Sequence, residues 1–70
     1  MRAVTFKIWY FHYALNEELE YNITITYPAT YKGDYLKKAW HDVIYKALAY
    51  LHDNGGLDVM ELCRVDLISG

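Results

Sequence analysis

The sequence has only one cysteine, Cys63, among its 70 residues. A single cysteine cannot form an intramolecular disulfide, which excludes the disulfide frameworks that stabilise many small secreted domains. The three histidines lie at positions unrelated to it, so the spacing of a structural zinc site is missing as well. We therefore expect no metal and no cofactor. A chain of this length must then be stabilised by dense packing or by association with another protein.

Basic residues are also scarce, with seven Lys and Arg against nine Asp and Glu and a net charge of −2. Without a basic cluster, nucleic acid is an unfavoured partner. No apolar run approaches the length of a membrane span, so no membrane contact is expected. The first residues lead into a strand-like segment interrupted by Lys7, which does not read as a secretion leader. These features favour a cytoplasmic location.

Hydrophobic residues, by contrast, are abundant. They make up 54% of the chain, and 17% of it is aromatic, including eight tyrosines. Disordered segments are depleted in these residues, so the composition indicates a folded chain. Its length allows one domain, residues 1–70.

Residues 3–13 are predicted to form a strand that is apolar on both faces, since alternate residues of a strand point to opposite sides. One face carries Val4, Phe6, Ile8 and Tyr10, and the other carries Trp9, Phe11 and Tyr13. Residues 19–27 alternate more simply, with apolar side chains on one face and polar ones on the other. They predict a second strand, which ends at Pro28 because proline cannot donate to a sheet.

A helix is predicted from about residue 35 to residue 53. Asp34 suits its N-cap, and Asn54-Gly55-Gly56 is typical of a helix end. The spacing of three and four residues defines an apolar stripe made of Leu36, Trp40, Val43, Ala47, Leu48 and Leu51. Residues 57–68 then form a third strand.

The element order strand, strand, helix, strand predicts an α+β fold of ββαβ type. Because the first strand is apolar on both faces, we place it in the centre of a three-stranded antiparallel sheet of order 2-1-3. The helix packs on one face of this sheet. The alternative order is 1-2-3 with a right-handed crossover.

The third strand is ambiguous, because apolar residues occur at both parities. We place Leu57, Val59, Cys63, Val65 and Leu67 toward the helix. The face without a helix then carries a predicted protein interface made of Trp9, Phe11, Tyr13, Met60 and Leu62. Adjoining large apolar residues on an open face usually mark an interface.

Catalysis is not expected. Ser69 is the only serine, Cys63 lies within a strand and is predicted to be buried and inert, and His41 and His52 are too far apart along one helix to share a proton or a metal. His12 is interpreted as a strand-end residue with a polar tip.

The leading hypothesis is therefore a small non-enzymatic protein-interaction module, either a homodimer or a domain that docks on a larger protein. One alternative is a single-stranded nucleic-acid binder that stacks bases on the sheet aromatics, although only Lys7 and Arg64 add positive charge there. Another alternative, by analogy of size alone, is a phage or mobile-element protein that inhibits a host protein.

Overall fold

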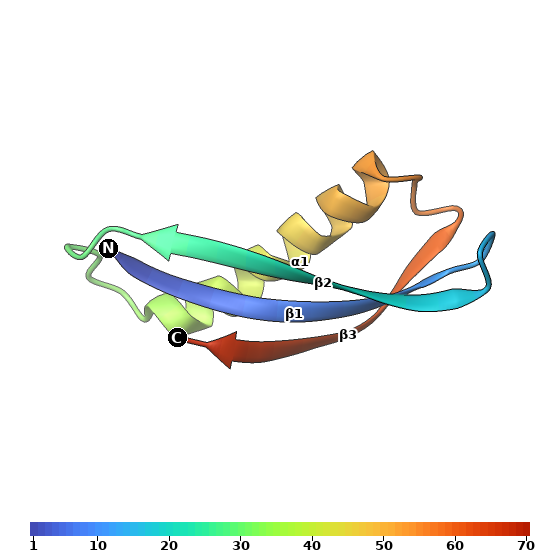
Figure 1. The fold of residues 1–70 in the computed structure, drawn as a ribbon. Helices are drawn as coiled ribbons and strands as arrows, with labels where there is room; N and C mark the ends of the chain where they lie inside the picture. Colours follow the sequence, from blue (N-terminus) through green and yellow to red (C-terminus); the bar gives the residue numbers. More distant parts are fainter.

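Residues 1–70 of the computed structural model form a three-stranded sheet and one helix (Figure 1). The elements are β1 (Arg2–His12), β2 (Glu17–Tyr27), α1 (Tyr35–Asp53) and β3 (Met60–Ser69). The sheet is fully antiparallel in the order β2-β1-β3, and α1 crosses one of its faces obliquely. The predicted ββαβ fold and strand order are confirmed, and the alternative order 1-2-3 is wrong.

The β1–β2 hairpin closes through a short turn. Asn16 adopts φ 54°, a left-handed conformation that asparagine tolerates better than most residues. His12, the last residue of β1, accepts a hydrogen bond on Nδ1 from the Leu15 backbone N–H at 3.3 Å. His12 is thus a strand-end residue with a polar tip, as predicted, and its ring also contacts the turn.

Local sequence sets both ends of α1. The Asp34 carboxylate accepts a hydrogen bond from the Lys37 backbone N–H at 3.1 Å, which satisfies one free amide of the first turn. After the last helical residue, the Gly56 N–H donates to the Leu51 carbonyl at 2.9 Å. Gly56 has φ 96°, a conformation that favours glycine. The predicted helix bounds and caps are confirmed.

The core lies between α1 and the sheet. Its strand side consists of the inward residues of β1 and β2, and its helix side consists of small and medium side chains. The twelve buried residues are Val4, Phe6, Ile8, Tyr10, Ile23, Ile25, Tyr27, Ala39, Val43, Ala47, Leu51 and Met60.

Three residues of the predicted helix stripe are not among these twelve, and one of them, Leu36, is partly buried against the core. Trp40 and Leu48 are 42% and 37% exposed, whereas Ala39, outside the predicted stripe, is fully buried. The reason is that α1 packs more extensively on β2 than on β3. The buried residues of α1 are therefore rotated toward β2 relative to the predicted stripe. Trp40 lies at the border of the core, in an edge-on contact with Phe6 in which the ring centroids are 4.8 Å apart.

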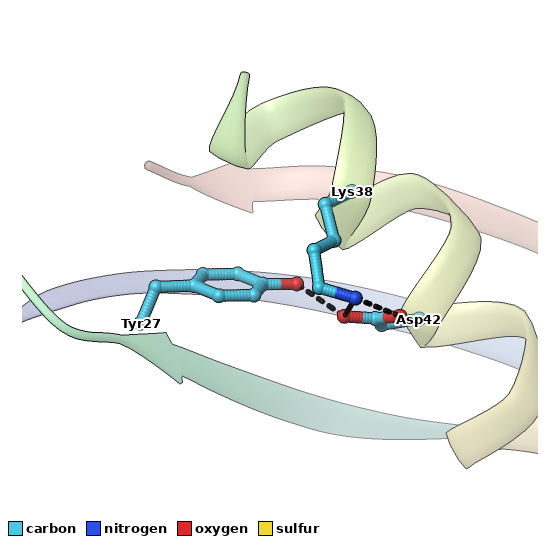
Figure 2. Close-up of polar contacts among 3 residues, drawn as sticks. All are labelled: Tyr27, Lys38 and Asp42. Carbon is cyan, nitrogen blue, oxygen red and sulfur yellow. Dashed lines mark hydrogen bonds and ion pairs between the residues drawn. The ribbon is translucent and has the colours of Figure 1, made fainter. Parts of the chain in front are cut away.

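A polar contact anchors α1 to β2 (Figure 2). The buried Tyr27 donates its hydroxyl hydrogen to Asp42 Oδ2 at 2.6 Å, and Lys38 forms an ion pair with the same carboxylate at 3.3 Å. Burial and the bond to Asp42 raise the pKa of Tyr27. The same bond, helped by Lys38, lowers the pKa of Asp42.

The inward face of β3 differs from the prediction because β3 contains a bulge. Trp9 pairs with Arg64 but the next residue, Tyr10, pairs with Leu62, so Cys63 is the extra residue. A one-residue bulge exchanges the faces of all residues beyond it. Cys63, predicted to be buried, is exposed for this reason.

Candidate protein-binding face

Trp9, Phe11 and Tyr13 lie on the sheet face that α1 leaves uncovered. Trp9 and Phe11 alternate with the buried residues of β1, and Tyr13 follows directly after the strand. The rings of Phe11 and Tyr13 meet edge to face with centroids 5.1 Å apart. We call these three residues the aromatic row. The prediction placed them on the open face, and the structure agrees.

The indole of Trp9 is flanked by two cations. The Arg64 guanidinium lies 4.8 Å from the ring centroid and Lys7 Nζ lies 5.8 Å from it. Each cation is held by a carboxylate, Arg64 by Asp66 at 2.6 Å and Lys7 by Glu20 at 3.6 Å. The Asp66 contact raises the pKa of Arg64. Trp9 is half-buried, with both cations within cation–π distance of its ring.

Tyr13 is the most exposed member of the row, at 55%. Its hydroxyl donates to Glu61 Oε2 at 2.6 Å, and its backbone N–H donates to the Val59 carbonyl at 2.8 Å. The bond to Glu61 raises the pKa of Tyr13, since ionisation would place two negative charges side by side. The phenol therefore stays neutral and anchored at the end of the row.

Polar residues surround the aromatic row on both neighbouring strands. The register places two cations and four carboxylates on this face, a net charge of −2. The charged residues are Lys7, Arg64, Glu18, Glu20, Glu61 and Asp66. Both cations are already paired, so the face offers an acidic rim to an incoming molecule.

Met60 and Leu62 do not belong to this face, although they were predicted there. Met60 is 3% exposed and part of the core, and Leu62 packs against the core. The bulge at Cys63 turns both residues toward the helix and turns Glu61 outward. The sequence carries only a partial signal: Met60 and Leu62 are at even positions and Val65 and Leu67 are at odd ones, but Leu57, Val59 and Ile68 break this pattern.

A second set of partly exposed apolar side chains lies where α1 meets β3. We call it the α1–β3 flank. On α1 the flank comprises residues spaced four positions apart, on the side of the helix opposite Asp42. On β3 it comprises residues that point toward the helix. Its members are Trp40, Ile44, Leu48, Leu62, Val65 and Leu67. The sequence analysis placed Trp40 and Leu48 in the apolar stripe of the helix and Val65 and Leu67 toward the helix, but it placed Leu62 on the open face.

Two hollows open to solvent lie elsewhere on the molecule. One, about 350 Å³, lies between β2 and the second half of α1, beside the stacked rings of Tyr21 and Tyr50, whose centroids are 3.9 Å apart. The other, about 440 Å³, lies at the start of α1 and is lined by Tyr31, Asp34, Lys37, Lys38 and His41. Neither places a cysteine or serine beside a histidine, the arrangement that nucleophilic catalysis uses.

No group of three or more His, Cys, Asp and Glu side chains is positioned to hold a metal ion. His41 and His52 are both exposed on α1. The helix is not apolar enough over its length to cross a membrane.

The chain matches no protein-family model, and comparison with curated proteins and with solved structures finds no match. The geometry of its own residues therefore carries the functional argument.

Proposed function

We propose that this chain is a small non-enzymatic protein-interaction module that docks a partner protein onto the aromatic row of its open sheet face. The observation that carries the proposal is the arrangement around Trp9, with Arg64 stacked on its indole and Phe11 and Tyr13 continuing the row. Trp, Tyr and Arg are the residues that most often supply the binding energy of protein interfaces.

The charge around the row favours a particular kind of partner. With four carboxylates against two cations, two copies of this face would repel each other if they stacked back to back. A partner with an apolar pocket for Trp9 and a basic rim would instead meet complementary charge. We therefore propose a different protein, rather than a second copy, as the occupant of this face.

The same charge argues against the nucleic-acid alternative. Base-stacking surfaces are surrounded by cations that follow the phosphate backbone, and here both cations are engaged by carboxylates. Titration of the protein with single-stranded oligonucleotides at low salt would test it. Quenching of tryptophan fluorescence that weakens steeply with salt would favour nucleic acid over the proposed function.

The direct test compares three immobilised forms of the protein as bait: wild type, Trp9→Ala and Tyr45→Ala. Tyr45 is a matched control, because it is 77% exposed on the outer side of α1. We expect a partner retained by wild type and by Tyr45→Ala to be lost with Trp9→Ala. The partner would then be purified and its affinity measured. A central interface tryptophan predicts a Kd at least about 30-fold weaker for Trp9→Ala.

Circular dichroism of the Trp9→Ala bait must show an intact fold for this comparison. A partner retained equally by all three baits would place the binding site away from the aromatic row and contradict the proposal. Loss of binding with Tyr45→Ala alone would place it on α1.

A further inference from the structure

β3 is an edge strand with one unpaired side. In the order β2-β1-β3 it pairs only with β1, through eight residue pairs with register shifts at Cys63 and Ile68. Its outer backbone groups are thus available to another strand. The opposite edge, β2, differs in charge: it carries three glutamates and no cation, so it offers no attractive pair to a second copy of itself.

The apolar surface beside β3 is also incompletely covered. The Tyr27–Asp42 contact joins one side of α1 to β2, and on its other side the α1–β3 flank is open to solvent. Within it Trp40, Ile44 and Leu67 are 42%, 40% and 40% exposed. A domain of this size gains stability when such a surface is buried by a neighbouring molecule.

The charges of β3 are self-complementary about one residue. Arg64 and Asp66 share the open face and flank Val65, which points toward the helix side. If two copies of β3 pair antiparallel with Val65 opposite Val65, Arg64 of each copy faces Asp66 of the other. If the pairing is centred on residue 64 instead of Val65, Arg64 faces Arg64. If it is centred on residue 66, Asp66 faces Asp66. Opposite charges directly across two strands stabilise a sheet, and like charges destabilise it.

We propose that two copies of this chain associate through antiparallel pairing of their β3 edges, with Val65 at the two-fold axis. The product is a continuous six-stranded sheet with both helices on one face. The two α1–β3 flanks then meet across the axis and cover each other's apolar residues. Such an interface is isologous, as in most homodimers.

This inference can be tested separately from the proposed function. The dimer uses the β3 edge, the helix side of the sheet and the charges of Arg64 and Asp66, whereas partner docking uses the aromatic row. Arg64 belongs to both surfaces, and Trp9→Ala separates them because it leaves Arg64 in place. In the dimer both aromatic rows lie on the same side of the six-stranded sheet and stay accessible. Trp9→Ala is accordingly expected to leave the dimer mass unchanged.

The test is a charge exchange read by light scattering and native mass spectrometry. The wild-type chain is expected to have twice its mass of 8.3 kDa. In R64D the introduced carboxylate faces Asp66 of the second copy, and in D66R the introduced guanidinium faces Arg64. Each variant alone should dimerise roughly tenfold or more weakly, because the like-charge contact occurs twice per dimer. Mixed in equal amounts, the two variants should form a heterodimer, since every facing pair is then opposite in charge.

Matched controls separate this contact from general charge effects. Lys46→Asp and Asp53→Arg change the net charge by the same amounts on exposed residues of α1 that line the hollow beside β2, away from β3. Each should remain dimeric alone, like wild type. If R64D or D66R fails to fold by circular dichroism, R64E and D66K give the same charge arrangement and replace them.

Three results would overturn the proposal: a monomeric wild type up to millimolar concentration, dimers of both single variants as strong as wild type, or single variants that stay monomeric when mixed. A heterodimer formed only in the R64D and D66R mixture supports both the edge and the register.

Discussion

The Tyr27 hydroxyl donates a 2.6 Å hydrogen bond to the Asp42 carboxylate and thereby joins the end of β2 to α1. On the other side of α1, the helix side of β3 is only partly covered. The contact and the exposed α1–β3 flank, on which the proposed dimer depends, thus lie on opposite sides of α1.

Replacing Tyr27 with Phe should destabilise the fold by on the order of 1 kcal/mol. The variant keeps the buried ring but removes the hydroxyl that donates to the Asp42 carboxylate. Chemical denaturation of wild type and Tyr27→Phe measures the difference in the free energy of unfolding. Tyr45→Phe is the matched control, because the Tyr45 side chain is exposed and no change is expected.

The difference between wild type and Tyr27→Phe should also depend on pH. The bond from Tyr27 is the largest cause of the lowered pKa of Asp42. A group with a lowered folded-state pKa stabilises the protein above its unfolded pKa, about 3.9 for Asp, and that contribution is lost as pH falls through the folded value. The free-energy difference should therefore be full at neutral pH and shrink in acid. A constant difference down to pH values where carboxylates are protonated would contradict this origin.

The sequence predicts the elements and their order well because local signals define them. The double-sided apolarity around Trp9 identifies β1 as the central strand, and Asp34 and Gly56 mark the ends of α1. The predictions that were wrong, the inward face of β3 and the buried side of α1, depend on tertiary contacts. The bulge at Cys63 lies in the pairing with β1, and the rotation of α1 accompanies its packing on β2 and a bond between residues 15 positions apart.

The candidate site was predicted only in part, because two of its five predicted residues lie on β3, whose register depends on tertiary contacts. Trp9, Phe11 and Tyr13 follow from the alternation of β1 alone, which no bulge interrupts between β1 and β2. The placement of Met60 and Leu62 depends on the register of β3. Uniform alternation along this strand predicted the wrong face for both residues.

The rotation of α1 predicts that Trp40→Ala is the milder of two helix variants. Trp40 is 42% exposed and borders solvent, so its removal leaves no closed cavity, and the expected loss is about 1–2 kcal/mol. Leu51 is fully buried, and Leu51→Ala should cost about 2–5 kcal/mol. Denaturant midpoints of the two variants give the comparison. A larger loss for Trp40→Ala would mean that the indole is part of the core.

The cap of α1 gives a prediction that depends on a single side chain. Asp34→Ala removes the acceptor of the Lys37 N–H and should destabilise the protein by about 1 kcal/mol. Asp34→Ser can accept the same bond and should recover most of that loss. Thermal melts followed by helical circular dichroism distinguish them. Equal melting temperatures for Asp34→Ala and wild type would show that the cap adds nothing to stability.

The bulge in β3 can be tested through the titration of a tyrosine on the other strand. Glu61 lies next to Tyr13 only because the bulge turns it to the open face, and its carboxylate is the main cause of the raised pKa of Tyr13. Glu61→Gln removes the negative charge and should move one tyrosine ionisation to lower pH in a spectrophotometric titration. In the background of Tyr13→Phe the same substitution should have no effect. An unchanged titration in Glu61→Gln alone would place Glu61 away from Tyr13 and return Met60 and Leu62 to the open face.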